Sequence, residues 1–210
     1  MSSQEFLKHP GINLGSHHGD AHEKAETVVF GFWVFLMSDF VLFGLMFATY
    51  VTMQNPMSYA GGPGPKDVFD LTSAFVQTML LLTSSLTFGF ASLAMRHKHE
   101  TGRHKMWLVI TLALGLAFLF FELRDFQEMF AMGAGPDRSG FLSAFFGLVP
   151  LHGVHVTVGC LWLIIMLVQL HVFGPITIVK TRLLRLSLFW HFLDIVWIGI
   201  FSIVYLPGLV

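Results

Sequence analysis

Six acidic or histidine side chains lie towards the middle of long apolar stretches of this sequence, where an acid or an imidazole is poorly solvated. Each buried acid costs roughly 2.5–3.5 kcal/mol on scales derived from membrane insertion, so three unpaired carboxylates would together cost on the order of 8–10 kcal/mol. That sum rivals the net stability of a typical protein. The acids must therefore be paired, protonated or beside water. The six residues are Asp39, Glu122, His152, His155, His191 and Asp194.

Three kinds of chemistry fit such a set. Acids and histidines on facing helices can hold a bundle together, as can nearby hydroxyls such as Ser38, Ser84, Ser85 and Thr157. Intramembrane acids also mark proton paths and ligand sites, or meet lipid headgroups and partner subunits. We favour the first interpretation, with interhelical polar contacts at all six positions and no catalytic residue.

A metal site is the third kind of chemistry. His152 and His155 are three residues apart in "HGVH", so they share a helix face about 4.5 Å apart along the axis. A transition metal needs three or four ligands, which His191 and an aspartate would have to complete. Paired packing histidines are commoner, and haem ligation needs opposed imidazoles from facing helices. We therefore expect no metal ligand and no cofactor-binding residue on this chain.

The elements that position these residues are five long apolar runs. Each run exceeds the ~20 residues needed to cross ~30 Å of hydrocarbon as a helix, and a membrane span of this kind must be helical because every backbone amide needs a partner there. The sequence predicts an all-α, polytopic membrane protein, a bundle of five transmembrane helices over residues 28–210, after a polar and flexible N-terminal tail over residues 1–27. The predicted spans are about Val28–Met53, Leu71–Met95, Met106–Phe130, Phe141–Leu170 and Leu183–Leu206.

Composition agrees with this prediction. Hydrophobic residues make up 54% of the 210 residues and charged residues only 12%, against about 25% charged in soluble domains. The net charge of −1 gives no general attraction to nucleic acid, and we expect no nucleic-acid partner. Cys160 is the only cysteine, which excludes an intrachain disulfide and a thiolate metal cluster.

Basic residues in the short loops predict the orientation. They follow the second run (Arg96, Lys98, Arg103, Lys105) and the fourth (Lys180, Arg182, Arg185), whereas the opposite loops offer only Lys66 and Arg138. The N-terminus should therefore be cytoplasmic and the C-terminus periplasmic. Three tyrosines would then lie at the outer membrane interface, where amphipathic rings settle: Tyr50, Tyr59 and Tyr205.

Four stretches carry a family resemblance. They are "GFWVFLMSDFVLFGLMFATY" (31–50), "GPDRSGFLSAFF" (135–146), "HGVHVTVG" (152–159) and "SLFWHFLDIVWI" (187–198). Together they resemble subunit III of haem-copper terminal oxidases, in particular the bacterial quinol oxidase branch of the cytochrome bo type. The likeness covers nearly all of the chain after the first twenty-odd residues.

The resemblance implies a non-catalytic subunit of a proton-pumping ubiquinol oxidase of the aerobic respiratory chain, multi-pass in the bacterial inner membrane. Its partners would be subunit I, which it stabilises and which holds the haem and copper, and subunits II and IV. Asp39 matches the family's intramembrane acid, which is often Glu, and Glu122 matches the acid of the next helix but one. His152, His155, His191 and Asp194 match the other polar positions.

One departure from the family concerns lipid. Longer relatives have seven spans and hold phospholipid in a cleft between two helix groups, whereas this chain has five apolar runs. That cleft cannot form from this chain alone, so phospholipid stays an open expectation.

Other classes of protein remain as alternatives. The first is subunit III of a cytochrome c oxidase, which this chain separates poorly from the quinol oxidase type. The second is a free-standing membrane transporter, which an odd number of spans disfavours because inverted repeats would give corresponding halves. A membrane metallo-enzyme is a distant third.

Overall fold

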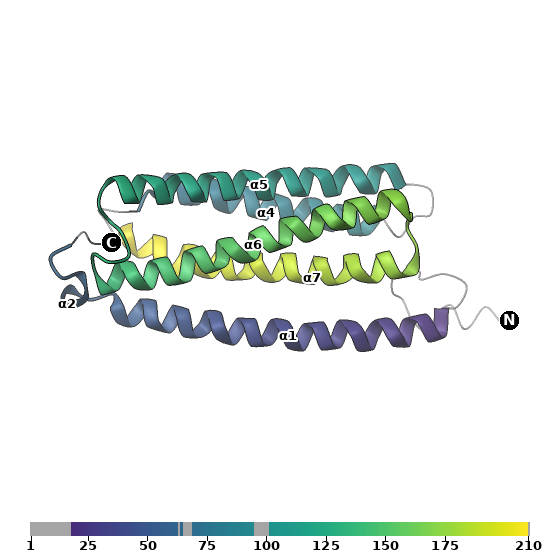
Figure 1. Ribbon diagram of the computed structural model, residues 1–210, viewed down its shortest axis with the longest axis horizontal. Helices are drawn as coiled ribbons and strands as arrows, with labels where there is room; N and C mark the ends of the chain where they lie inside the picture. The colour runs from purple at the N-terminus through teal and green to yellow at the C-terminus, as the bar shows by residue number, and fades with distance from the viewer. Residues whose placement is uncertain (1–17, 63, 65–68, 95–100, 210) are drawn as a thin grey trace.

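The structure is a computed structural model that describes residues 18–62, 64, 69–94 and 101–209. All regular structure in these residues is helical, and five of the helices are long and apolar enough to cross a membrane. The protein is therefore an all-α, multi-pass membrane protein. Figure 1 shows the long helices lying roughly side by side along one axis.

The five long helices correspond to the five predicted spans, although the predicted fifth span, which ends at Leu206, continues past the end of its helix. They are α1 (His18–Met53), α4 (Leu71–Ala94), α5 (Thr101–Ala131), α6 (Gly140–Val172) and α7 (Thr177–Ile200). Short elements complete the described chain: α2 (Pro56–Tyr59), the π-helical turn η2 (Phe201–Tyr205) and the 3-10 turn η3 (Leu206–Leu209).

Most helices run past the ends of the apolar runs, because a helix continues into water while its backbone hydrogen bonds are satisfied. The largest difference is at α1, which begins at His18 and so takes in the last ten residues of the segment assigned to a flexible tail. The apolar part of α1 begins at Thr27. The rest of that tail, the predicted second-span end Met95 and the basic residues Arg96 and Lys98 lie outside the described residues.

The ends of the helices have local causes. Ser139 caps α6, its side chain accepting a hydrogen bond from the backbone N–H of Leu142 at 3.2 Å. Gly133 and Gly174 follow α5 and α6 with positive φ, a conformation that glycine adopts without a Cβ clash. These turns reverse the direction of the chain within a few residues, so the helices that they connect become neighbours.

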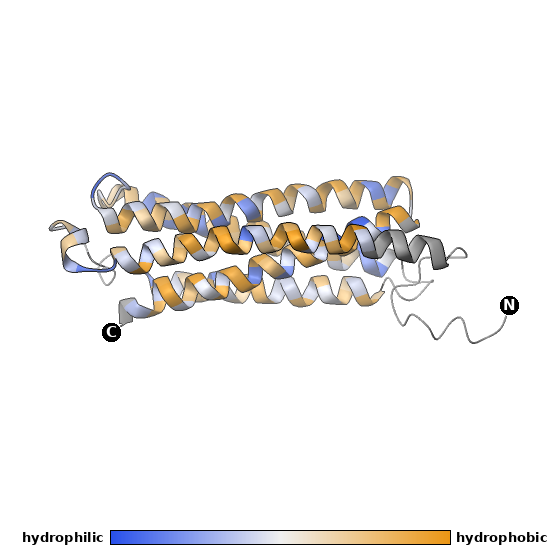
Figure 2. Cartoon of the chain, turned by 90° about the horizontal axis from the view of Figure 1, so that it is seen from below, coloured by the Kyte–Doolittle hydropathy of each residue, from blue (hydrophilic) through white to orange (hydrophobic). Residues whose placement is uncertain are grey.

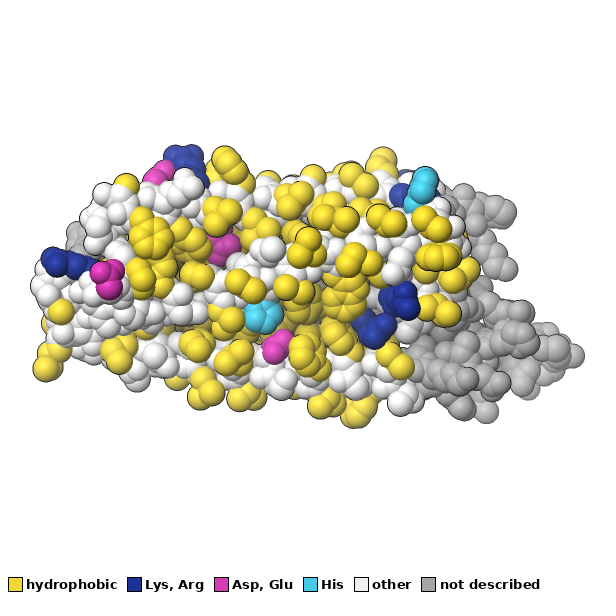
Figure 3. All heavy atoms as spheres, in the orientation of Figure 1, with side chains coloured by type: hydrophobic (Ala, Val, Ile, Leu, Met, Phe, Trp, Pro, Cys, Tyr) yellow, Lys and Arg dark blue, Asp and Glu magenta, His cyan; other side chains and the backbone are white. Residues whose placement is uncertain are grey.

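Helix α7 lies in the middle of the bundle. It packs against α1, α4 and α6, while α4 and α5 form the most extensive helix pair. Half of the most apolar 18-residue stretch of the α7 span is buried inside the protein. For the corresponding stretch of α1 the buried share is 11%. Figure 2 shows hydrophobic residues over most of the length of the helices, and in Figure 3 hydrophobic side chains cover most of the visible face, with charged groups mainly towards its ends.

Aromatic rings fill the core between the helices. The largest fully buried side chains include Trp190 and Trp197 of α7. Tyr50 and Tyr205 are buried within the chain and pack against phenylalanines at one end of the bundle. Phe141 and Phe69 cover the two rings, so both side chains face the core, and their depth at the outer membrane interface stays a prediction.

Candidate functional site

Asp39 and His155 face each other between α1 and α6. Asp39 Oδ2 lies 3.8 Å from His155 Nε2, and both side chains keep some exposure. His155 Nδ1 donates to the carbonyl of Leu151 in its own helix at 2.8 Å, which fixes the ring with Nε2 towards the acid. At 3.8 Å the contact is electrostatic and too long for a direct hydrogen bond.

His191 and Asp194 form the second polar group, on α7. His191 Nδ1 lies 2.7 Å from Ser85 Oγ of α4, a hydrogen bond between two helices. Asp194 Oδ2 is 3.8 Å from the same nitrogen, one helical turn along α7. Both carboxylate oxygens of Asp194 are buried with no hydrogen-bond partner among the described residues. The expected interhelical hydrogen bond is thus made by His191, while Asp194 lies behind it.

His152 makes no hydrogen bond to any described residue, so the structure shows no interhelical polar contact of the predicted kind for it. His152 is fully buried, with both ring nitrogens unpartnered, and its ring packs against Phe118, Trp197 and Phe43. His152 therefore contributes ring packing at the centre of the bundle.

Glu122 of α5 lies against the backbone of α6. An ideal Cβ placed on Gly153 would come within 2.6 Å of Glu122 Oε2, so the glycine makes room for the carboxylate. Glu122 Oε1 is buried and has no hydrogen-bond partner among the described residues. The "HGVH" stretch therefore has a role for its glycine as well as for its histidines.

Helix α4 carries polar contacts that the sequence analysis missed. Ser73 Oγ donates to Asp125 of α5 at 2.8 Å, and Gln77 Nε2 donates to the same carboxylate at 2.6 Å. Thr87 and Thr111 pair their hydroxyls between the same two helices at 2.8 Å. The signal was present as polar residues spaced along an apolar run, such as Ser73 and Gln77 four residues apart, but their partners lie on another helix.

Two tryptophans of α7 also hydrogen bond to α4. Trp190 Nε1 donates to Ser84 Oγ and Trp197 Nε1 donates to Thr78 Oγ1, both at 3.0 Å. Both rings are almost fully buried. The tryptophans therefore join helices through a directional contact as well as through ring packing.

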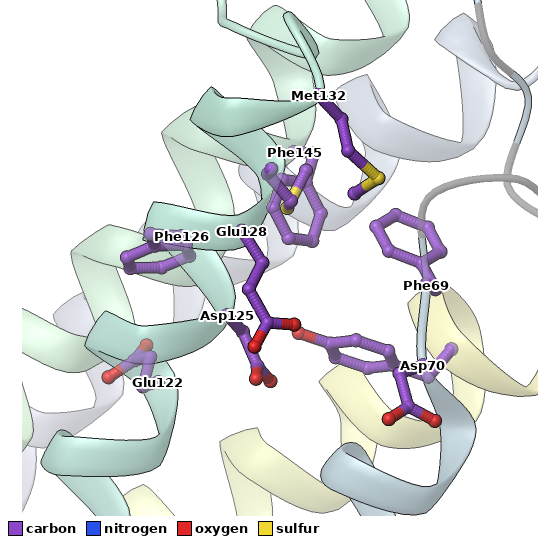
Figure 4. Close-up of a pocket in the computed structure, with 10 residues that line it drawn as sticks. Phe69, Asp70, Glu122, Asp125, Phe126, Glu128, Met132 and Phe145 are labelled. Carbon is purple, nitrogen blue, oxygen red and sulfur yellow. The ribbon is translucent and has the colours of Figure 1, made fainter.

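A cavity of about 230 Å³ opens near the end of the bundle where α4 begins and α5 ends. Its walls combine carboxylates with aromatic and thioether side chains (Figure 4): Phe69, Asp70, Glu122, Asp125, Phe126, Glu128, Met129, Met132, Phe145 and Tyr205. In Figure 4, Asp70, Asp125 and Glu128 gather on one side, and Glu122 lies further along α5. Of the six predicted residues, only Glu122 lines this cavity.

The described residues bring no three histidine, cysteine or acidic side chains close enough together to hold a metal ion. His152 and His155 both lie on α6, but one ring is packed among aromatic rings and the other faces Asp39. The arrangement suits a protein whose buried polar groups join helices. The fold and these contacts define a multi-pass helical membrane protein.

Comparison with known proteins identifies the family. Residues 10–209 match the family model described as cytochrome c oxidase subunit III. A relative from Pseudomonas aeruginosa, named cytochrome bo(3) ubiquinol oxidase subunit 3, is 47% identical over 99% of each chain. A protein of the same name from Buchnera aphidicola is 41% identical over 89% of this chain and 97% of its own.

A third relative is named as a quinol oxidase subunit. The probable quinol oxidase subunit 3 of Staphylococcus epidermidis is 38% identical over 95% of each chain. The chain described here belongs to the cytochrome c oxidase subunit III family. Membership in a family of oxidase subunits places it in a multi-subunit complex.

Proposed function

We propose that this chain is the non-catalytic subunit III of a proton-pumping bacterial ubiquinol oxidase and that it stabilises the catalytic subunit I. The observation that carries the proposal is the 47% identity, over essentially the whole length, to a protein named as a ubiquinol oxidase subunit 3. Haem and copper would be held by subunit I and none by this chain. Its own residues would position helices and bind neighbouring subunits.

The proposal includes partners and a location. Subunit I is the main contact, with subunits II and IV as further partners in the bacterial inner membrane. The basic residues of the loops favour a cytoplasmic N-terminus and a periplasmic C-terminus. Helix α1 supports a docking role, because exposed apolar side chains cover most of its outward surface. An apolar surface of this kind packs against lipid or against the apolar helices of another subunit.

Affinity purification tests the proposal most directly. The tagged chain, extracted in mild detergent, should bring down a haem-containing subunit I, and the purified complex should consume oxygen with ubiquinol and not with reduced cytochrome c. The reverse preference would favour the cytochrome c oxidase alternative, which the family description keeps in view. Purification of the chain without haem-containing partners would contradict a subunit role.

Substitution of Asp194 tests the structural role of the polar groups. Its carboxylate is buried behind His191. Asp194→Ala therefore leaves a small void and removes the acidic neighbour of the His191 ring. We expect less assembled complex, with unchanged haem spectra in whatever assembles. Asp137→Asn, in the exposed loop before α6, is the matched control. Altered haem spectra in a fully assembled Asp194→Ala complex would contradict the proposed role.

A further inference from the structure

We infer that the face of α4 and α7 around His191 binds a transmembrane helix of a partner subunit, and that this helix donates a hydrogen bond to His191 Nε2. The inference rests on the proposed subunit role, because it requires a neighbouring subunit. It goes beyond that role by assigning a contact surface and the chemistry of the partner side chain. The surface lies on α4 and α7 and not on the exposed side of α1.

His191 places an exposed imidazole at the middle of the membrane. It lies thirteen residues after the start and fourteen before the end of the span Ile178–Tyr205, so each end of the span is roughly 20 Å away along the helix axis. Its side chain is 42% exposed, against 19% for His155. Histidines at this depth normally face a bundle interior or a water-filled cavity. An exposed one therefore indicates a surface that a partner covers.

The inward side of the His191 ring is occupied. Nδ1 lies 2.7 Å from Ser85 Oγ of α4 and 3.8 Å from Asp194 Oδ2, and the ring of Phe88 lies edge-on to the imidazole. An ionised carboxylate can only accept hydrogen bonds, so the nearby acid favours the tautomer with the proton on Nδ1. In that tautomer Nδ1–H donates to Ser85 Oγ, and the three neighbours hold the ring in one orientation.

The outward nitrogen of His191, Nε2, has no partner within the chain. It makes no hydrogen bond to any described residue, and it is not among the buried unpartnered atoms. With the proton on Nδ1, Nε2 carries a lone pair and accepts. Water is absent at this depth, and lipid headgroups lie about 15 Å away, at half the thickness of the hydrocarbon. The donor must therefore be a group that itself enters the hydrocarbon, such as a hydroxyl, amide or indole N–H on another helix.

The surface of α4 beside His191 allows a helix to approach closely. Ser85 and Gly89 lie one turn apart, and a Cβ on Gly89 would meet nothing within 4 Å. Gly115 and Gly153 differ, because a Cβ on either would lie 2.8 or 2.6 Å from a side chain of this chain. Small residues four apart let two helix backbones come close in a membrane. Gly89 has no such use inside the chain and is open to a helix outside it.

Exposed apolar side chains complete the face. Ile195 and Ile198 lie one and two turns after His191 on the same side of α7, and Leu82 lies one turn before Ser85 on α4. All three are exposed. A long apolar surface with a single polar acceptor matches a transmembrane helix that carries a single polar donor.

A photo-cross-linking experiment on the whole complex tests the inference. A photoreactive amino acid replaces Ile195 and is activated in membranes before the complex is purified through a tag on another subunit. We expect a cross-link to a transmembrane segment of a partner subunit that carries a hydroxyl, amide or indole group at mid-depth. A product with lipid or another small molecule, a product with a second copy of this chain, or no product overturns the inference and leaves the subunit role intact. Absence of any partner subunit contradicts the subunit role as well.

Variants of His191 test the outward hydrogen bond. Each variant is produced together with the wild-type chain, and quantitative mass spectrometry compares their ratio in the purified complex with their ratio in the membrane. His191→Leu should lower incorporation roughly three- to tenfold, the factor for one interhelical hydrogen bond in a membrane. His191→Gln should stay within about twofold of wild type, because its amide oxygen can accept the same bond. Normal incorporation of His191→Leu, or equal losses in both variants, overturns the inference.

Two further variants separate docking from stability within the chain. Ser84→Ala removes the hydrogen bond that Trp190 of α7 donates to α4 but leaves the outward face unchanged, so incorporation should stay within about twofold of wild type. Gly89→Leu should lower incorporation at least as much as His191→Leu, because it blocks close approach, while the chain itself is no less stable to SDS. A loss in Ser84→Ala equal to that in His191→Leu would assign the effect to internal packing and overturn the inference, as would normal incorporation of Gly89→Leu.

Discussion

Helix α7 packs against α4 on one side and against α1 on another, and polar contacts are distributed unequally between the two sides. Towards α4 it makes three side-chain hydrogen bonds, from Trp190, His191 and Trp197. Towards α1 the packing is mostly aromatic, as where Phe43 meets Phe192. On that side Tyr50 of α1 donates one long hydrogen bond, of 3.5 Å, to the carbonyl of Val204 in the turn η2 that continues α7. Asp39 of α1 also approaches His155 of α6 at 3.8 Å.

The difference matters because lipid gives helices little hydrophobic reason to associate. Close packing and interhelical hydrogen bonds must supply the association instead. The α4–α5–α7 region has both and should be stable within this chain alone. Helix α1 has fewer directional contacts and an exposed apolar surface, so its position should depend more on what lies outside the chain.

A glycine in each region gives the largest expected contrast. An ideal Cβ at Gly115 of α5 would lie 2.8 Å from the buried ring of Trp190, whereas one at Gly44 of α1 meets nothing within 4 Å. Gly115→Ala should destabilise the protein by about 1–3 kcal/mol through overpacking. Gly44→Ala should be neutral or stabilising by up to about 1 kcal/mol, because glycine disfavours helix. Unfolding by SDS in mixed micelles, followed by circular dichroism, measures both.

The two glycine variants together test the comparison. A stable Gly115→Ala protein would mean that Trp190 can move aside, and the α5–α7 packing would then be looser than the structure indicates. Equal destabilisation by both variants would remove the contrast between the two regions.

Asp125 should give the next largest effect. Asp125→Ala removes the carboxylate that accepts hydrogen bonds from Ser73 and Gln77. These two donor groups of α4 are then left without that acceptor. A lost partner of this kind costs about 1–3 kcal/mol. Glu128→Ala, which breaks only an exposed ion pair with Arg124, should cost less than about 1 kcal/mol. The same SDS titration ranks the two, and a reversed order would place the main α4–α5 contact elsewhere.

The hydrogen bond between Trp190 and Ser84 should show a measurable coupling energy. A double-mutant cycle of Trp190→Phe and Ser84→Ala isolates it, because Phe keeps most of the ring packing and removes the N–H donor. Interhelical hydrogen bonds of this kind average about 0.6 kcal/mol and reach about 1.7. A coupling of zero in the SDS unfolding free energies would mean that the two groups find other partners when separated.

The apolar runs were sufficient to predict the five long helices, because the thickness of the hydrocarbon and the need to satisfy backbone amides restrict what such a run can form. The start of α1 at His18 was not predictable on this basis, since the residues before Thr27 are polar. A helix end outside the hydrocarbon depends on local propensity and caps, which have much weaker signals.

The polar residues were recognised as a set, but their pairing was not. Which acid meets which histidine depends on the rotation of each helix about its axis, and a helix that is apolar all round does not reveal that rotation. Asp39 and His155 therefore face each other, while His152, three residues from His155, points among aromatic rings. The hydroxyls of α4 were missed as partners of Trp190 and Trp197 for the same reason.

The smallest effect is expected where α1 meets α6. Asp39 and His155 are 3.8 Å apart and partly exposed, beyond hydrogen-bonding distance, so a cycle of Asp39→Asn and His155→Phe should give a coupling below about 0.5 kcal/mol, as for exposed ion pairs. The Trp190–Ser84 cycle is the internal standard. If α1 depends on neighbours outside the chain, the Asp39–His155 coupling should increase when the unfolding of the assembled complex is measured instead. A coupling that matches the standard in the isolated chain would contradict the comparison, because α1 would then be held as firmly as α4.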